Sequence, residues 1–464
     1  MNKKISQYIF LIVTGSLLFI SCKVTEPYTA PQSLPFDQYR DQQQTDSVNI
    51  ASISRNEFFT DPLLQAYIDS GISNNPDLQM ALMRIQQSQS YYSQSKAAFL
   101  PSLNANASFT ESKLSEAQGF GIRTSATQFV LGVTSDWEAD IWGKLRSSRK
   151  ASLASLLQTE MASKAIQTRL VADIANYYYL LLALDEQLAI TRQTVINWDT
   201  TVQTMRALKE AASVTEAAVV QSEAQRYAAE VTIPDLKQSI RETENALSIL
   251  LGRPPGAIER SSLQSQKMVA ALQTGVPAQL LVNRPDVQQA ELNFRYYFEM
   301  TNVARSFFYP SLSINTSAGL SSLALADFLD PASFAASIGA GILQPIFNRR
   351  LNRTRLEVAR SQQQEALLGF RNTLLNAGRE VSDAISLYEN AGEKISIRTL
   401  QMDALQKSVN FSEELLQNGF ANYIEIINAR QSLLLAELGK VNDRLQQLQS
   451  GVNLYRSLGG GWKE

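Results

Sequence analysis

The sequence predicts a mainly helical chain made of two related halves, each with one β-hairpin and one long helical hairpin. Three observations lead to this fold class. A passage that starts at Asn75 recurs from Arg284, at an offset of 209 residues. In both copies the spacing of apolar residues changes from the helical period of 3.6 to the strand period of 2. A helical tract of unusual length follows each pair of predicted strands.

The repeat can be followed residue by residue. The first copy reads NPDLQMALMRIQQSQSYYSQSKAAFLPSLNANASF, and the second reads RPDVQQAELNFRYYFEMTNVARSFFYPSLSINTSAGL. Matched positions include Pro76 and Pro285, Gln79 and Gln288, Ala81 and Ala290, Phe99 and Phe308, Pro101 and Pro310, and Asn106 and Asn315. A repeat of this length indicates one architecture built from two halves, which we place at residues 61–260 and 261–464.

Prolines mark the helices that begin the first half. Asp61 followed by Pro62 predicts the start of a short helix, and Pro76 predicts the start of a second helix that runs to about Phe99. Pro101 then ends that helix. Each of these prolines stands at a helix start or just beyond a helix end, where its missing N–H group costs least.

Alternation of apolar and polar residues predicts four strands. It occurs at residues 102–111 and 128–138 in the first half, and at residues 311–320 and 336–342 in the second. We therefore expect two β-hairpins, at about 101–140 and about 310–345, with one apolar face and one polar face.

Each hairpin of strands is followed by a predicted helical hairpin, at about 142–252 and about 347–458. The tract from Trp142 to Glu210 predicts one helix about 100 Å long. Small and turn-forming residues at 211–215 and 418–422 predict the two tips, and Pro234 predicts a kink in the first returning helix. Two apolar seams repeat every three or four residues: Leu170, Ile174, Tyr177, Leu181, Leu184, Leu188, Thr191, Val195, Trp198, Val202 and Met205, and then Ile424, Ile427, Gln431, Leu434, Leu438, Val441, Leu445, Leu448, Val452 and Tyr455.

Composition argues against an enzyme. The chain has 42 Lys plus Arg and 44 Asp plus Glu, so its net charge of -2 predicts no nucleic-acid partner. It has no histidine and a single cysteine, which excludes a Ser-His-Asp triad and a Cys/His metal site. No glycine-rich motif for phosphate or dinucleotide binding is present. We expect no catalytic residue, no metal and no cofactor.

The N-terminus predicts export. Lys3 and Lys4 precede an apolar run from Ile9 to Ile20, which is long enough for a signal peptide and short for a membrane span. The following Ser21-Cys22 resembles the cleavage box of bacterial lipoproteins, which implies a signal peptide at 1–21 and lipid attachment at Cys22. The alternative is an ordinary secretory signal. Residues 22–60 predict an extended, acylated leader.

Four amphipathic strands leave unpaired edges. Within lipid, each unpaired backbone group costs several kcal/mol, so only a closed barrel spans a membrane. Four strands do not close around a wet lumen, so several copies must contribute, and three copies give twelve strands. Two alternatives remain open: hairpins buried on a soluble α+β protein, and a periplasmic coiled-coil lipoprotein with a scaffolding role.

Four motifs resemble the TolC/OprM-like outer-membrane efflux proteins, of the lipoprotein type found in resistance-nodulation-division pumps. They are NRPDVQQAE from Asn283, FFYPSLSIN from Phe307, LQPIFNRRL from Leu343 and LLGRPPG from Leu250. The resemblance extends from about Asp61 to Gly460. It implies a homotrimer with a twelve-stranded transmembrane β-barrel and a periplasmic α-barrel. It also implies passive export of small molecules such as drugs, toxic compounds or metal ions, with a periplasmic adaptor and an inner-membrane pump as partners. Protein export in type I secretion is the alternative transport function.

The resemblance also implies functional residues. The periplasmic tips meet the adaptor, and the matching residues are Ala211, Ala212, Ser213, Asn418, Gly419 and Phe420. Glu425 and Asn428 match the periplasmic gate, one helical turn apart, although Glu425 as an ordinary solvated carboxylate is the alternative. Arg349 and Arg350 stand where the family usually has a glycine-containing turn, and we expect them to face either lipid headgroups or neighbouring carboxylates.

Overall fold

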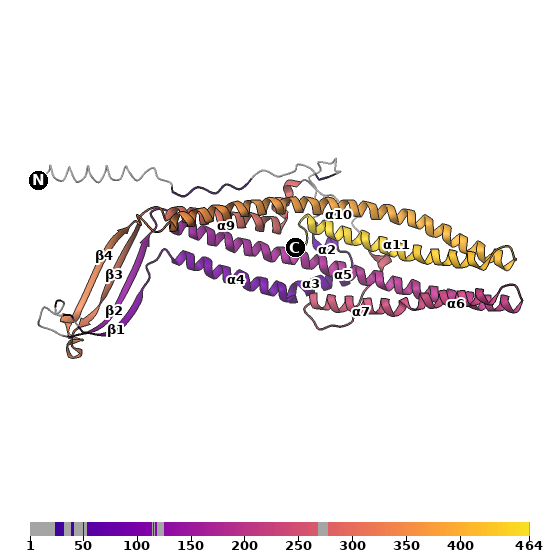
Figure 1. Ribbon diagram of the computed structural model, residues 1–464, viewed down its shortest axis with the longest axis horizontal. Helices are drawn as coiled ribbons and strands as arrows, with labels where there is room; N and C mark the ends of the chain where they lie inside the picture. The colour runs from indigo at the N-terminus through magenta and orange to yellow at the C-terminus, as the bar shows by residue number, and fades with distance from the viewer. Residues whose placement is uncertain are drawn as a thin grey trace. The chain divides into compact units, whose positions relative to one another are not determined.

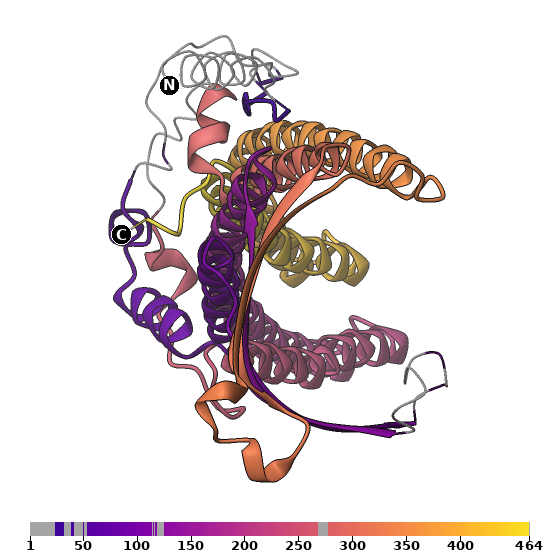
Figure 2. The ribbon, with the colours of Figure 1, turned by 90° about the vertical axis from the view of Figure 1, so that its left-hand side faces the viewer.

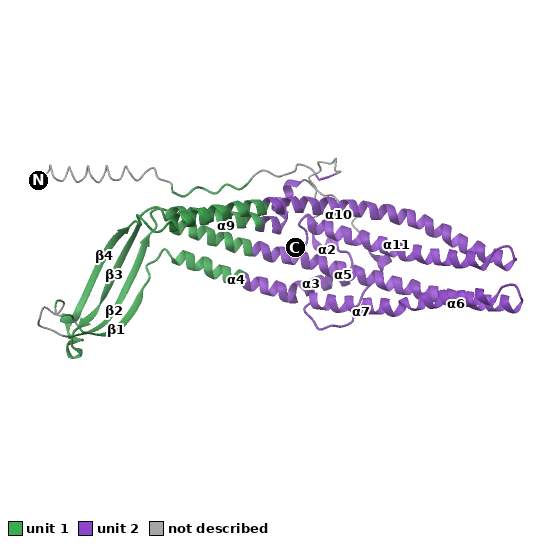
Figure 3. Cartoon of the chain, in the orientation of Figure 1, with its two compact units in different colours: residues 1–32, 85–159, 290–370 green, residues 33–84, 160–289, 371–464 purple. Residues whose placement is uncertain are grey.

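The computed structural model describes residues 24–31, 39–40, 50, 53–113, 115, 117, 125–267 and 277–463 (Figure 1). The predicted signal peptide and Cys22 lie outside these residues. Two compact units divide the chain, unit 1 with residues 1–32, 85–159 and 290–370, and unit 2 with residues 33–84, 160–289 and 371–464 (Figure 3). Each unit takes segments from both sequence repeats. The compact units therefore differ from the two repeats that the sequence predicts.

Unit 1 contains a four-stranded antiparallel sheet in the order β1-β2-β3-β4. Its strands are β1 (Asn104–Lys113), β2 (Ser125–Ala139), β3 (Ser311–Ser322) and β4 (Phe334–Leu343). Figure 2 shows that the sheet is curved. The four strands confirm the predicted alternation, and the β2–β3 pairing joins the hairpins of the two repeats into one sheet.

The strand register gives the sheet two chemically distinct faces. Apolar residues pair with apolar residues on one face, as in Phe109 with Phe129, Trp137 with Ile314, and Leu312 with Ile342. Polar residues pair on the other face, as in Asn104 with Thr134, Asp136 with Asn315, and Ser317 with Ser337. Because side chains alternate along a strand, a slip of one residue in any pairing would mix the two faces.

The helices begin and end close to the predicted positions. The short helices are α2 (Arg55–Phe58), α3 (Pro62–Asn74), α8 (Leu280–Asn283) and α6 (Glu216–Glu230), with α4 (Pro76–Ala97), α7 (Thr232–Leu250) and α9 (Pro285–Ser306) slightly longer. The long helices are α5 (Lys144–Glu210), α10 (Leu351–Gln417) and α11 (Tyr423–Ser457). Four 3₁₀ turns complete the described elements: η2 (Leu263–Ser265), η3 (Pro277–Gln279), η4 (Leu325–Asp327) and η5 (Pro331–Ser333). Within the described ranges, no helix combines the length and apolar character needed to cross a membrane.

The first returning helix is interrupted, as Pro234 predicts. Helix α6 ends at Glu230 and α7 begins at Thr232, with Val231 between them. Pro234 has no N–H group to donate to the carbonyl of Glu230, four residues earlier, so the helical hydrogen-bond pattern breaks there. The second returning helix, α11, has no proline and continues without interruption from Tyr423 to Ser457.

The first apolar seam is confirmed over most of its length. Ile174, Leu181, Trp198 and Met205 are at most 2 % exposed. Tyr177 is an error in the prediction, because it is 36 % exposed while its neighbour Tyr178 is fully buried. The heptad spacing alone selected Tyr177, whereas hydrogen bonds to residues far away in the sequence draw Tyr178 inward.

Unit 2 repeats one packing contact in both halves of the chain. In each half, a side chain just before a helix-starting proline donates to a carbonyl at the end of a returning helix, at 2.9 Å: Asn75 Nδ2 to Leu250 O, and Arg284 Nη1 to Ser457 O. A glycine at that helix end then lies directly against a backbone carbonyl. A Cβ atom would stand 2.3 Å from Asn74 O at Gly252, and 2.4 Å from Asn283 O at Gly459. The repeat therefore extends to individual atoms.

Candidate functional site

The two helical tips have the same backbone structure. After α5, the Ser213 N–H donates to Leu208 O at 2.8 Å and the Ala212 N–H donates to Lys209 O at 2.9 Å. After α10, the Phe420 N–H donates to Leu415 O at 2.8 Å and the Gly419 N–H donates to Leu416 O at 3.0 Å. This pair of bonds is the Schellman motif, which satisfies carbonyl groups at a helix end.

The motif requires one residue with a left-handed backbone conformation at each tip. Gly419 fills that position in the second tip with a φ of 76°, and Ala212 fills it in the first tip with a φ of 59°. Glycine adopts this conformation without steric cost, whereas the Cβ atom of alanine opposes it by about 1 kcal/mol. The first tip is therefore built under strain that the second tip lacks.

All six residues predicted to meet an adaptor lie at these turns and are exposed: Ala211, Ala212, Ser213, Asn418, Gly419 and Phe420. Phe420 is 82 % exposed, which is unusual for a phenylalanine in a structured turn. The turns thus present backbone and one large aromatic ring at the surface of unit 2.

Apolar side chains hold the two tips together behind these turns. Met205 of α5, Val219 of α6 and Ile426 of α11 are buried in one cluster, and Leu416 of α10 packs against it. Ion pairs add to the hairpins, between Arg206 and Glu223, Lys209 and Glu216, and Arg430 and Glu413. The two helical hairpins therefore form one packed end within unit 2.

The predicted gate residues lie on the solvent side of α11. Asn422 caps this helix, since its Oδ1 accepts from the Ile424 N–H at 3.2 Å. Glu425 follows in the first turn, and Asn428 lies one turn later; both are exposed, while Ile426 and Ile427 between them are buried. The structure brings Glu425 and Asn428 together on one exposed helix face, and their packed neighbours fix that face in place.

A second candidate surface is the polar face of the sheet in unit 1. It carries Asn, Ser and Thr side chains from all four strands, together with Asp136 and Glu138 near the end of β2. Glu138 pairs with Lys144 at 2.8 Å, at the start of α5. The face offers hydrogen-bonding groups and few apolar contacts, which suits contact with water.

A buried carboxylate, which the sequence analysis missed, organises the base of unit 2. Asp61 caps α3 and accepts four hydrogen bonds, from the Leu63 N–H, Tyr178 Oη, Ser261 Oγ and Gln266 Nε2, at 2.5 to 2.9 Å. Burial alone would raise the pKa of Asp61, but these donors together lower it below its ordinary value. The only signal in the sequence was an aspartate at a helix cap.

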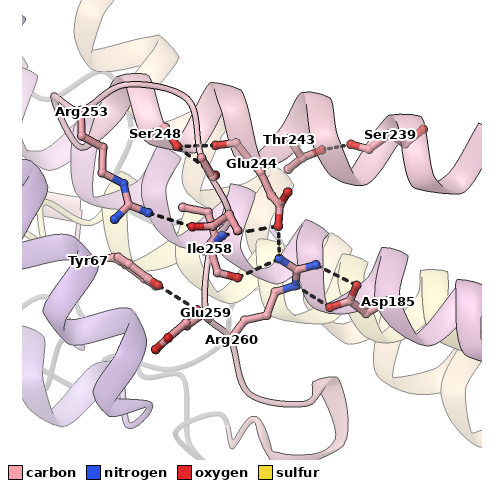
Figure 4. A network of polar contacts seen from close by, with 12 residues as sticks. Tyr67, Asp185, Ser239, Thr243, Glu244, Ser248, Arg253, Ile258, Glu259 and Arg260 are labelled. Atoms are coloured by element: carbon pink, nitrogen blue, oxygen red, sulfur yellow. Dashed lines mark hydrogen bonds and ion pairs between the residues drawn. The ribbon is translucent and has the colours of Figure 1, made fainter.

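The loop after α7 is fixed by a neighbouring ionic network (Figure 4). Arg260 contacts Asp185 of α5 at 2.5 Å and Glu244 of α7 at 2.5 Å, and it also donates to the Ile258 carbonyl at 2.8 Å. The hydrogen bond with Asp185, followed by the contact with Glu244, raises the pKa of Arg260. Arg260 therefore stays charged and ties the loop to two helices.

Across the described ranges, no group of three or more His, Cys, Asp or Glu side chains is arranged to hold a metal ion. The polar clusters of unit 2 are closed by hydrogen bonds among themselves. The tips, the α11 face with Glu425 and the polar face of the sheet are exposed surfaces.

Comparisons with known proteins agree with this architecture. A family model described as "Outer membrane efflux protein" matches residues 67–253 and 276–460, one match in each repeat. The solvent efflux pump outer membrane protein SrpC of Pseudomonas putida is 27 % identical over 418 residues, which cover 90 % of this chain and 89 % of SrpC. The cation efflux system protein CusC of Escherichia coli is 27 % identical over 461 residues, covering 97 % of this chain and 98 % of CusC. A membrane protein from Pseudomonas aeruginosa has the same fold in its crystal structure, with a TM-score of 0.89, 25 % identity, and coverage of 95 % of this chain and 98 % of that chain.

Proposed function

Since the chain belongs to the outer membrane efflux protein family, we propose that it is the outer-membrane channel of a tripartite efflux system. Small molecules pass through its bore without being changed, driven by a separate pump. The proposal includes no catalytic step.

The sheet of unit 1 is the observation that carries the proposal. Its three pairings separate an apolar face from a polar face. Among the described strands, β1 and β4 have a partner on one side only. In a membrane those edges must pair with other strands, and identical copies supply them. Three copies make a barrel of twelve strands, with the apolar faces toward lipid and the polar faces toward a wet bore.

The tips are the proposed contact with a periplasmic adaptor, which joins the channel to an inner-membrane pump of the resistance-nodulation-division type. Phe420 supports this role because an exposed aromatic ring suits the centre of a protein interface. The exposed backbone of both turns offers further hydrogen bonds. The twin turn structures give the adaptor two similar docking points per copy.

Glu425 is the proposed gate residue, with Asn428 beside it. In a trimer, three Glu425 carboxylates form one ring, and like charges at short range repel one another or attract a cation. Asn428 adds no charge, so only one acidic ring results. The exposed position of both residues on α11 supports their access to the bore.

Anchoring by an acylated Cys22 remains part of the proposal. Residues near Cys22 in the sequence lie against unit 1: the Glu26 N–H donates to Asn302 Oδ1 at 3.0 Å, and Asn302 Nδ2 donates to Glu26 O at 3.0 Å. This two-way bond positions the leader on α9. Mass spectrometry of the mature N-terminus tests the anchor, because the proposal requires a diacylated or triacylated cysteine as the first residue.

The cargo does not follow from the family. SrpC is named for solvents and CusC for cations, at the same identity to this chain. We propose a small-molecule or metal-ion cargo chosen by the pump, because a wide polar bore needs no selective contact with what passes through.

Conductance and mass test the proposed function. We expect the full-length mature protein to be a trimer in detergent by native mass spectrometry, and to open ion-conducting pores in planar lipid bilayers. A water-soluble monomer without conductance would contradict the proposal and favour the scaffolding role.

The variant Glu425→Ala should change single-channel conductance or its response to divalent cations. Glu414→Ala, at an exposed residue of α10, is the control. Equal traces from the wild type and Glu425→Ala would remove the gate from the proposal.

A further inference from the structure

Two corners of unit 1, where strand leads into helix, are strongly basic. Corner 1 comprises residues 140–156, between β2 and α5, and contains four Lys or Arg residues and one Asp. Corner 2 comprises residues 344–360, between β4 and α10, and contains five Arg residues and one Glu. Because β2 and β4 run in the same direction in the antiparallel sheet, both corners lie at the same end of it.

The backbone of corner 2 is strained at two consecutive arginines. Arg349 has a φ of 54° and Arg350 a φ of 68°, in the left-handed region that glycine occupies freely. Each of these two arginines opposes folding, because a Cβ atom is crowded in this region. Glycine at either position would remove that cost.

The charges are also placed against the helix dipole. Neither α5 nor α10 has an acidic residue in its first turn. The positive end of a helix favours acidic side chains and disfavours arginine and lysine. At the start of α5, Asp140 offsets this charge, because its carboxylate accepts from the Leu145 and Arg146 N–H groups. Corner 2 therefore carries the excess of positive charge where a helix start favours negative charge.

Local carboxylates do not neutralise corner 2. Its single acid, Glu357, is shared by Arg350 at 3.4 Å and Arg353 at 3.0 Å. Arg355 lies over the Phe307 ring at 4.7 Å, and no described residue forms an ion pair with Arg349. At least one guanidinium is left for an anion from outside the chain.

Apolar side chains stand beside these charges. Ile346 is 99 % exposed and Phe347 is 87 % exposed, just beyond the end of β4. In corner 1, the Trp142 and Tyr309 rings lie 5.0 Å apart, and Trp142 donates to Pro310 O at 2.6 Å. Exposed apolar and aromatic groups next to arginines are typical of the boundary between lipid tails and headgroups. A carboxylate on a neighbouring copy would need the arginines but not the exposed Ile346 and Phe347.

In corner 1, carboxylates within the chain already pair with Lys144, Arg146 and Lys150. We propose that corner 2 binds the phosphate groups of anionic phospholipids, in the leaflet of the outer membrane that faces the periplasm. Ile346 and Phe347 enter the acyl region, while Arg349 and Arg350 contact the headgroup phosphates. This inference rests on the proposed function, because it requires the apolar face of the sheet to lie in a membrane.

Two double variants test the inference in the full-length mature protein. Arg349→Gly with Arg350→Gly removes both charges and relieves the backbone, so it should fold at least as stably as the wild type. Arg349→Gln with Arg350→Gln removes the charges and keeps the strain. Arg169→Gln with Arg192→Gln is the matched control, because both arginines are exposed on α5 away from the corners.

Dioleoylphosphatidylglycerol and dioleoylphosphatidylcholine are added to the detergent-solubilised protein, and the bound lipids are counted by native mass spectrometry. The wild type and the control should bind more phosphatidylglycerol than phosphatidylcholine. In both corner variants the ratio of the two bound lipids should fall about tenfold. High salt should lower this ratio as well.

Equal binding of the two lipids by the wild type would overturn the inference. Corner variants that keep the preference for phosphatidylglycerol would also overturn it. Corner variants that no longer form a trimer would overturn it too, because the arginines would then contact a neighbouring copy. The same spectra report the assembly. A wild-type protein that is a trimer but shows no lipid preference contradicts only this inference. A wild-type protein that forms no trimer contradicts the proposed function.

Discussion

Ala212 holds a left-handed backbone conformation at a position where the second tip has Gly419. The two turns share the same pair of hydrogen bonds, so the difference between them is a single Cβ atom. A Cβ added at Gly419 would meet no atom within 4 Å, which leaves backbone strain as the only cost of alanine there. The pair thus isolates one physical effect in two matched places.

Exchanging these residues should move the stability of each tip in opposite directions. We expect Ala212→Gly to stabilise the first tip by about 1 kcal/mol, and Gly419→Ala to destabilise the second tip by a similar amount. Hydrogen exchange of the turn amides is the measurement, with each unmodified tip as the internal control. Faster exchange in Ala212→Gly would contradict the assignment of strain.

Asp61 should make the base of unit 2 sensitive to acid. Its pKa is lowered in the folded protein from an ordinary value of 3.8, so its contribution to stability is present above that value. The contribution is lost as pH falls through the lower, folded value. We expect Asp61→Asn to be destabilised by about 2 kcal/mol at pH 7, because three side-chain donors then face an amide instead of a carboxylate.

Thermal unfolding of the wild type and Asp61→Asn, followed from pH 7 to pH 2.5, measures this effect. The difference between the two proteins should shrink below about pH 4. The variant Asp403→Asn, at an exposed residue of α10, is the control. A constant difference at every pH would contradict the lowered pKa.

Sequence reasoning located the residues that act through local rules and missed those that act through distant contacts. Pro62, Pro76 and Pro234 each altered the backbone where predicted, because proline acts on its own helix turn. The partners of Asp61 lie up to 205 positions away in the sequence, so no local pattern identifies them. The left-handed Ala212 was equally hidden, since alanine gives no turn signal.

At the scale of elements, the strands were predictable and their joining was not. Alternation depends only on neighbouring residues, so it located all four strands within a few residues of their observed bounds. The pairing of β2 with β3 unites segments from different repeats. Periodicity within each strand could not predict this pairing, because the two strands are far apart in the sequence. For the candidate site, small and turn-forming residues predicted the positions of the tips, and the family resemblance supplied their adaptor role and Glu425. The packing behind them came only from the structure.

Glycines mark the place where the two repeats meet. Gly132 of β2 pairs with Gly319 of β3, and a Cβ at Gly319 would stand 2.3 Å from Leu131 O and 2.4 Å from the Gly132 Cα. At Gly339 of β4, by contrast, the nearest atom to an added Cβ is Asn315 O at 4.0 Å. The close approach is specific to the seam between the repeats.

Alanine should therefore be tolerated at one of these positions and not at the other. We expect Gly319→Ala to weaken the sheet by about 1–3 kcal/mol, because backbone atoms have to move to admit the new methyl group. The measurement is the amount of heat-stable oligomer in the outer-membrane fraction, with Gly339→Ala as the matched control. Equal amounts from both variants would contradict the close contact at the seam.

At the scale of the whole molecule, the sheet of unit 1 is the part that needs other copies. Among the described strands, its edge strands β1 and β4 each pair on one side only. The polar positions of β1 have even numbers and those of β4 have odd numbers, so both edges present the same two faces. Within one sheet, two strands separate these edges, and no disulfide spans that distance. A covalent bond between β1 and β4 can therefore form only between copies.

Cysteine cross-linking of these edges tests the central claim most directly. Ser108→Cys in β1 is combined in turn with Ala335→Cys, Ser337→Cys or Gly339→Cys in β4, all on the polar face, in a chain whose only natural cysteine is Cys22. Phe109→Cys on the apolar face replaces Ser108→Cys as the control. We predict that at least one polar-face pair gives covalent dimers and trimers in outer membranes under oxidising conditions, and that the control pairs do not. Chains that stay monomeric with every pair would contradict the closure of the sheet by identical copies.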